Sequence, residues 1–474
     1  SYVNNAVEGI VPNNKLMSHI INLRITNQIS ERFSTDAKIT YHRRQMKSIP
    51  RYGEGNTPFF DIYKIGRNVT TAMARHYQDI NSVGVPVLAP WPTPAAGVYS
   101  NPYWIVNNDR NDQLRNNIVG FLRAQYKLTD WLSIRGSANI DYYDQLGDRR
   151  TYQSTVSWAP AAGGRYEQIN SRSLQQWFDL MLEGNNKIGK DIKVNYHLGT
   201  IYKDNNTDAT TNLANGLKIP NNFTLVMASA PEISQGGQQI QTQSVFGLAS
   251  VSLKDYLFLE GTVRNDWDSR LPAPHSYLYY SFGLSGILSD MFVLPSGISY
   301  LKAFVNYSEV GNGGDYGLLT TVNTLTNGVG AGYIQRGPIL PAADLKPEIV
   351  KTIEGGVDVR FLDNRLGISL NYYKSNTMNQ LFSVPLTLAT GYSSMYINAG
   401  DVQNSGLEAV LNATPVRNSR FGWDVAFNFG MNRNKIIKLT DEVKVINQGQ
   451  VTWGGQPRVM EGGSFGDLYS RTWI

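Results

Sequence analysis

Hydrophobic and polar residues alternate along most of this chain with a period of two. From Leu132 to Tyr142 every second residue is apolar or small, whereas the residues between them are serine, arginine, asparagine and aspartate. The pattern recurs around residues 192–198, 353–361, 366–372 and 423–431. Because successive side chains of a β-strand point to opposite faces of the sheet, the alternation predicts strands with one apolar and one polar face.

The alternating runs divide the chain into about fourteen long strands. They span residues 17–28, 33–45, 115–128, 131–143, 173–184, 190–203, 241–253, 256–267, 276–288, 298–310, 349–361, 365–380, 403–416 and 420–435, and a further strand starts near Phe465. Many of these runs are about 11 to 14 residues long, against roughly 5 to 6 for a typical strand. A tilted strand that crosses a membrane needs about 9 to 11 residues.

Short and long connections alternate between these strands. Short links lie at 29–32, 129–130, 185–189, 254–255, 289–297, 362–364 and 417–419. Long links lie at 46–114, 144–172, 204–240, 311–348 and 381–402, and the link at 268–275 is a short member of this second set. An up-and-down meander places all short links at one end and all long links at the other, which is typical of outer-membrane barrels. A soluble sandwich has no reason to sort its loops in this way.

Aromatic residues mark the ends of the predicted strands. Trp131, Tyr256 and Trp423 lie beside short links, whereas Tyr142, Tyr202, Trp267, Tyr307 and Tyr372 lie near the long ones. Two such girdles are expected at the two membrane interfaces of a barrel.

The composition agrees with a membrane barrel. Only 17% of the 474 residues are charged, below the roughly 25% of soluble domains. No segment approaches the roughly 18 consecutive apolar residues of a spanning helix, so a membrane protein of this sequence must be a barrel. We predict an all-β, transmembrane, antiparallel up-and-down β-barrel. Because open sheet edges in lipid leave backbone groups unpaired, we expect further strands outside this sequence.

The motifs that carry chemistry are weak in this sequence. Residues 462–466 match the G-x-S-x-G nucleophile pattern, but no histidine follows them in the chain. The five histidines show no metal-ligand spacing, and Cys is absent. Basic residues are scattered rather than striped, which argues against nucleic acid as a partner. We therefore predict no catalytic residue, no metal site and no cofactor.

The long links contain large aromatic residues that are candidates for substrate binding. They are Trp91, Tyr99, Tyr103, Trp104, Trp158 and Tyr166. The apolar faces of such rings can bind sugars or peptides. The alternative is that these rings pack the loops onto one another or onto a partner protein, and either role orders some of the loops.

The stretch from Leu345 to Leu439 resembles the C-terminal barrel of the SusC/RagA family of TonB-dependent outer-membrane transporters. The resemblance rests on LKPEIVKTIEGGVDVRF with a following tyrosine-rich strand, on NAGDVQNSGLEAVLNATPV at 398–416, and on FGWDVAFNFGMNRNKIIKL. The segment EGGSFGDLY at 461–469 resembles the family's opening of the next strand. Gly400 and Gly406 belong to the N-x-G units, where we expect them to allow bends or bulges.

The resemblance implies that residues 1–474 are part of a barrel of about 22 strands. It implies an N-terminal plug domain, a TonB box and last strands that are absent from this sequence. The family imports glycans or peptides across the bacterial outer membrane together with a SusD-like surface lipoprotein that lids the barrel. Import is driven by the TonB complex, without covalent chemistry or a cofactor, and lipid surrounds the wall.

Three alternative functions remain open from the sequence. The first is TonB-dependent uptake of a metal chelate or a cobalamin. The second is a passive porin or an adhesin barrel. The third is a secreted β-rich protein that binds or hydrolyses glycans.

Overall fold

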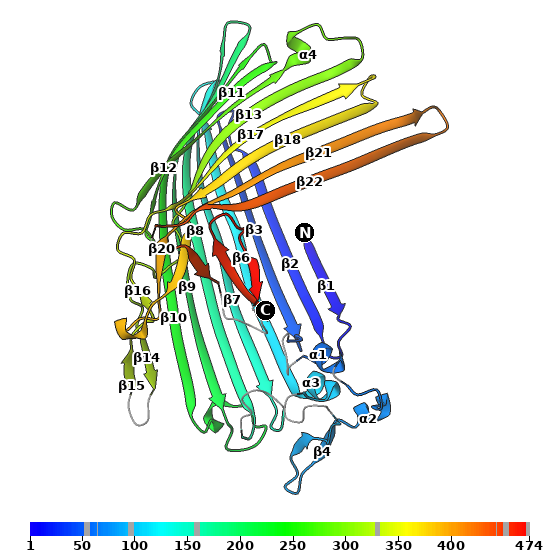
Figure 1. The fold of residues 1–474 in the computed structure, drawn as a ribbon, viewed down its shortest axis with the longest axis vertical. Coiled ribbons are helices and arrows are strands. Elements are labelled where there is room, and N and C mark those ends of the chain that lie inside the picture. Colours follow the sequence, from blue (N-terminus) through cyan, green and yellow to red (C-terminus); the bar gives the residue numbers. More distant parts are fainter. Residues whose placement is uncertain are drawn as a thin grey trace. The chain divides into compact units, whose positions relative to one another are not determined.

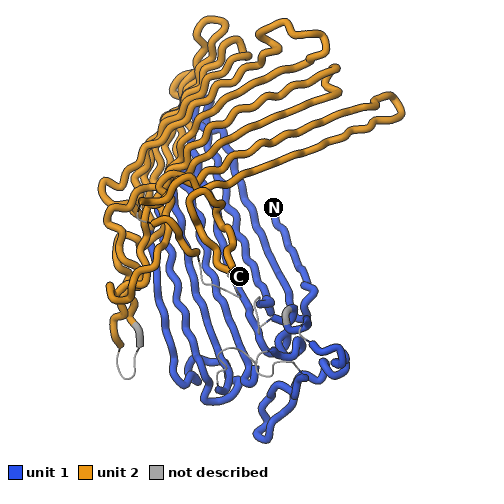
Figure 2. The backbone as a smooth tube through the Cα atoms, in the orientation of Figure 1, with its two compact units in different colours: residues 1–124, 137–178, 203–239 blue, residues 125–136, 179–202, 240–474 orange. Residues whose placement is uncertain are grey.

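The computed structural model describes residues 1–474 except 52–56, 64, 93–98, 156–161, 328–331, 442, 449–454 and 471–474. The chain divides into two compact units, coloured separately in Figure 2. Unit 1 comprises residues 1–124, 137–178 and 203–239, and unit 2 comprises residues 125–136, 179–202 and 240–474. Among the described residues, no helix is long and apolar enough to cross a membrane.

In the described part of the chain, fifteen strands form one sheet whose order follows the sequence, without a crossover (Figure 1). They are β1 (Tyr2–Glu8), β2 (Lys15–Gln28), β3 (Phe33–Lys47), β6 (Asp109–Lys127), β7 (Leu132–Thr151), β8 (Arg165–Ile188), β9 (Ile192–Asn215), β10 (Pro231–Leu253), β11 (Leu257–Asp268), β12 (Ser276–Ile287), β13 (Ile298–Asn312), β17 (Glu348–Phe361), β18 (Leu366–Met378), β21 (Asp401–Arg417) and β22 (Gly422–Lys438). The antiparallel up-and-down meander is therefore confirmed.

The remaining elements lie in the connections. The helices are α1 (Pro58–Tyr63), α2 (Thr71–Arg75), α3 (Pro102–Asn108) and α4 (Leu288–Met291), with short 3₁₀ turns at Leu225–Met227 and Leu388–Thr390. The small sheets are formed by β4 (Gln78–Ile80) with β5 (Pro86–Leu88), by β14 (Thr324–Asn327) with β15 (Gly332–Gln335), by β16 (Ile339–Leu340), β20 (Ser394–Asn398) and β19 (Leu381–Pro385), and by β23 (Val445–Asn447), β24 (Gly455–Met460) and β25 (Asp467–Ser470).

The structure differs from the sequence prediction at several strands, of which three examples follow. The strand β1 was not among the predicted strands, because its alternation is too short to stand out. Strands β8 and β9 have 24 residues each, about twice the predicted length, because they continue into segments that are polar on both faces. The strand expected near Phe465 exists as β25, but it pairs with β24 in a separate sheet.

In unit 2, the pairing register places the apolar residues of neighbouring strands on one continuous face. Val357, Leu370, Ala409 and Phe429 are successive partners across β17, β18, β21 and β22. The row two residues further toward the long links consists of Gly355, Tyr372, Leu407 and Met431. The large apolar side chains in these two rows are exposed, and the nearby Phe427 has an exposed fraction of 61%. A soluble protein would bury such a face, so we assign it to the lipid.

The opposite face of the same strands is polar. Asn371 donates hydrogen bonds from Nδ2 to Glu354 at 2.7 Å and to Glu408 at 3.5 Å. Tyr373 donates to Asn432 at 3.2 Å from the same face. This face suits a hydrated lumen.

The two glycines of the family-like motif have different structural roles. Gly400 has a φ of +104° and lies beside a register shift between β21 and β22, which confirms the expected bulge. At Gly406 an added Cβ would come within 2.5 Å of Cζ of Tyr373 and within 2.6 Å of the backbone carbonyl oxygen of Met431. The close approach of the neighbouring backbone and of this ring, rather than a bend, requires glycine at 406.

Placing a charge on the lipid-facing side should destabilise the barrel. We expect Leu370→Arg to lower the free energy of unfolding by about 2 to 4 kcal/mol, because Leu370 lies mid-way along the apolar face. Urea titration of the refolded full-length protein in lipid bilayers measures the effect. The matched control is Asn371→Arg, which places the same charge one residue on, between two glutamates. Equal losses in the two variants would contradict the assignment of the faces.

Candidate functional site

The longest connection in unit 1 spans residues 48–108, and its described part contacts the ends of β6 and β7. Its helix α3 begins at Pro102, and the side chain of Asn101 caps it by accepting a hydrogen bond from the backbone N–H of Tyr103 at 2.9 Å. Trp104 is completely buried and donates from Nε1 to Thr155 Oγ1 at 2.8 Å. Its ring also meets Tyr152 edge-on, with 6.4 Å between centroids. The loop is therefore packed rather than open.

A buried ion pair fastens the start of this connection to the sheet. Arg51 pairs with Asp109 at the beginning of β6, and the Asp109 side chain is only 1% exposed. Thr151 on β7 donates to Asp109 at 3.0 Å and accepts from Arg51 at 3.1 Å. Burial raises the pKa of the Asp109 carboxyl group, and this effect is larger than the attraction of Arg51, which lowers the pKa. Burial likewise lowers the pKa of Arg51 to about 10, so its guanidinium stays charged at neutral pH.

Further charged residues surround the ends of β7 and β8. Glu167 pairs with Arg149 at 3.1 Å and with Arg165 at 3.6 Å. On the neighbouring positions, Tyr166 donates its hydroxyl to Asp148 at 2.9 Å, and Asp148 also pairs with Arg150. These ion pairs join the ends of β7 and β8, although the Nε atoms of Arg149 and Arg165 are buried without a hydrogen-bond partner among the described residues. We interpret the cluster as the frame of the loops.

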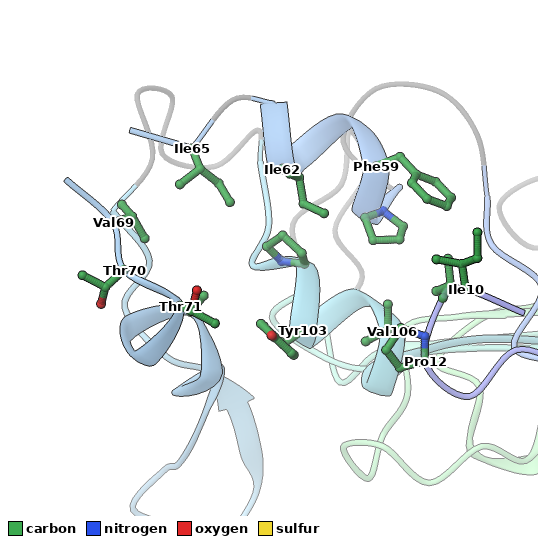
Figure 3. Close-up of a pocket in the computed structure, with 14 residues that line it drawn as sticks. Ile10, Pro12, Phe59, Ile62, Ile65, Val69, Thr70, Thr71, Tyr103 and Val106 are labelled. Carbon is green, nitrogen blue, oxygen red and sulfur yellow. The ribbon is translucent and has the colours of Figure 1, made fainter. Parts of the chain in front are cut away.

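An apolar cleft lies beside this frame (Figure 3). It is lined by residues of the β1–β2 link and of α1, α2 and α3, including Ile10, Pro12, Phe59, Ile62, Tyr103 and Val106. Its volume is about 380 Å³, within the range of ligand pockets. Ile10 is fully exposed and Phe59 is 51% exposed, so the cleft is open to solvent. The described lining residues are apolar except for Thr70, Thr71 and Tyr103. The cleft can therefore hold an apolar group beside a few hydroxyl groups.

The predicted substrate-binding aromatics fall in different environments. Tyr103 lines the cleft, whereas Trp104 and Tyr166 are buried in the loop frame. Trp91 and Tyr99 are half-buried, and Trp158 lies outside the described residues. The substrate-binding role of these six residues remains a prediction.

Sequence reasoning missed the aliphatic part of the cleft. Ile10 and Val11 precede a proline in a short link, and Phe59, Ile62 and Ile65 occur in a segment read only as a long loop. These residues could have been recognised by the high density of large apolar residues in a segment that lacks the alternation of a strand, which indicates a packed loop. Among the described residues, no group of three or more His, Cys, Asp or Glu has the geometry of a metal site.

Comparison with known proteins identifies the family. The family model "TonB dependent receptor-like, beta-barrel" matches residues 168–458. The chain belongs to this TonB-dependent receptor family. Its location is accordingly the bacterial outer membrane.

Two curated relatives and one solved structure place the chain within the family. TonB-dependent receptor P26 of Formosa agariphila is 23% identical over 447 residues, covering 91% of this chain and 43% of the relative. TonB-dependent receptor SusC of Bacteroides thetaiotaomicron is 35% identical over 98 residues, which cover 20% of this chain and 10% of the relative. The RagAB peptide transporter structure aligns with a TM-score of 0.78 at 18% identity, covering 97% of this chain and 51% of that one. The resemblance to SusC and RagA is thereby confirmed.

The chain spans about half the length of P26 and of the aligned chain in the RagAB structure. The TonB-dependent receptor barrel accounts for the sheet, for its apolar face and for the alternation of its connections.

Proposed function

We propose that the complete protein imports glycans or peptides across the outer membrane in a TonB-dependent manner, together with a surface lipoprotein that lids the barrel. The observation that carries this proposal is the local match to SusC, at 35% identity, within a chain whose fold follows RagAB. The relatives are about twice as long. Their additional length leaves room for a plug domain, a TonB box and the remaining strands.

The loop cluster of unit 1 supplies a surface for cargo or lid. The long connections lie at the extracellular end of such barrels. The cleft beside α1 and α3 offers an apolar wall with one tyrosine hydroxyl, which suits the apolar face of a sugar ring or a peptide side chain. We include Tyr103, Trp91, Tyr99 and Trp158 among the cargo contacts, with Trp104 and Tyr166 holding the loops in place.

Transport by the full-length protein tests the proposal. Uptake of labelled oligosaccharides and peptides is measured in a strain that lacks the gene and in the complemented strain. We expect uptake only with the gene, with an intact TonB box and with an energised inner membrane. We also expect a lipoprotein to co-purify with the tagged receptor. Uptake that persists without the TonB box would indicate a passive pore, and uptake restricted to a metal chelate or a cobalamin would change the cargo class.

The contribution of the cleft is tested with two tyrosine variants in the same loop. We expect Tyr103→Ala to weaken cargo binding about 2- to 12-fold, the effect of losing one aromatic contact. Tyr63→Ala is the matched control, because Tyr63 lies on α1, is 88% exposed and does not line the cleft. Binding is measured by titrating the purified full-length receptor with the transported cargo. Equal affinities of the two variants would remove Tyr103 from the cargo site without affecting the TonB test.

A further inference from the structure

Two rows of residues, all polar except Ile353, border the lipid-facing side of unit 2 at its extracellular end. The first row consists of Ile353, Lys374, Ser405 and Arg433, which are successive partners across β17, β18, β21 and β22. The second row consists of Lys351, Asn376, Gln403 and Lys435 on the same strands. By the alternation of the strands, both rows point to the same side as Tyr372, Leu407 and Met431. The strands are labelled in Figure 1.

Three cations of these rows form what we call the cationic patch, namely Lys374, Arg433 and Lys435. All three are exposed. Lys374 and Arg433 lie two strands apart, which corresponds to about 10 Å, and Arg433 and Lys435 lie about 7 Å apart along one strand. The hydroxyl of Ser405 and the amide of Gln403 lie between them. The patch therefore combines positive charge with neutral hydrogen-bond donors.

The acidic neighbours of the patch are already engaged. Glu309 on β13 pairs with Lys351 at 3.0 Å and accepts the hydroxyl of Tyr307. Asp401 accepts a hydrogen bond from Asn376 at 2.7 Å. In the part of the chain that the structure describes, Lys374, Arg433 and Lys435 have no carboxylate within ion-pair distance. Three uncompensated cations on an outer wall favour an anionic ligand.

The height of the patch on the wall points to the kind of ligand. On β18 the apolar positions run from Leu366 to Tyr372, and Lys374 is the next residue on that face. On β18 and β22 the patch begins directly above the apolar positions, at the level where lipid headgroups are expected. Arginine and lysine at this level can bind headgroup phosphates, arginine through two parallel N–H donors.

We propose that the cationic patch binds the phosphate groups of a phosphorylated glycolipid in the outer leaflet. Ser405 and Gln403 would donate hydrogen bonds to the sugar hydroxyls or phosphate oxygens between the cations. This site lies on the outer wall and does not involve the cargo. The proposal can therefore be tested independently of the transport function.

Lipid retained by the full-length receptor tests the proposal. The receptor is purified from its outer membrane in mild detergent, and bound glycolipid is counted by native mass spectrometry. We expect the variant K374Q/R433Q/K435Q to retain at least about 5-fold less lipid than the wild type. Removing even one cation from an anionic surface weakens binding by about this factor. The control K187Q/K190Q/K254Q removes three exposed cations at short links and should retain the lipid. Heat-modifiable gel migration verifies that each barrel is folded.

Two further measurements separate the source of the phosphate. Delipidated receptor in nanodiscs should retain the phosphorylated glycolipid but not its dephosphorylated form, and inorganic phosphate should not displace it. Equal retention of the two lipids, or displacement by inorganic phosphate, would overturn the proposal, as would wild-type retention by the triple variant. If the triple variant does not fold, the single variants Lys374→Gln and Arg433→Gln serve the same comparison.

Discussion

Replacing Asp109 with alanine is expected to lower the free energy of unfolding of the full-length protein by about 3 to 5 kcal/mol. The carboxylate is almost inaccessible and balances Arg51, which is itself largely buried. Removal of one partner leaves a charge without compensation in a medium that solvates it poorly, and Thr151 loses its acceptor. The loss should appear as a lower urea midpoint of the refolded barrel.

Two further variants show whether the effect comes from the isolated charge. Asp109→Ala/Arg51→Leu removes both charges and should recover a large part of the lost stability. Asp208→Ala breaks the Arg172–Asp208 pair, whose side chains are 58% and 47% exposed, and should change the free energy of unfolding far less. If Asp109→Ala and Asp208→Ala have the same cost, the buried pair is not an anchor.

Replacing Trp104 with alanine is expected to cost about 3 to 5 kcal/mol. The ring has no solvent-exposed surface, so its removal leaves a cavity under α3, and Thr155 loses a hydrogen-bond partner. Limited proteolysis of the folded full-length protein should show accelerated cleavage within residues 48–108. A urea titration gives the free energy.

Milder changes at the same place separate volume from hydrogen bonding. Trp104→Phe keeps an aromatic ring, and Thr155→Val removes only the hydrogen-bond acceptor. Each variant leaves one buried polar group without its partner, so each should cost about 1 to 3 kcal/mol. Unchanged stability of Trp104→Ala would show that the aromatic residues of this loop do not hold it together.

Alternation predicted the strands of the sheet except β1, because lipid and water impose opposite requirements on the two faces of a strand. The predicted strand at 366–372, for example, has Leu370 facing outward and Asn371 inward in the structure. The lengths of β8 and β9 were not predictable in the same way. The outer parts of these two strands are polar on both faces, so the alternation of apolar and polar residues that marks a strand is missing there.

The site was predictable only in part. Large aromatics in long connections made Tyr103 and Trp104 candidates, but the burial of Trp104 depends on Thr155 and Tyr152, about 50 residues further along the chain. The Arg51–Asp109 pair likewise joins residues separated by 58 positions. Single-sequence reasoning contains no information about such contacts, because they are set by how the loops dock.

The sheet order has a consequence for how the barrel forms. Every strand pairs with the next strand of the sheet in chain order, so each pairing closes a single intervening loop. Such a wall can assemble by adding one hairpin after another, with a modest entropic barrier at each step. In a closed barrel, only the pairing of the first strand with the last strand joins residues that are remote in sequence. We expect this last pairing to limit the rate of barrel insertion.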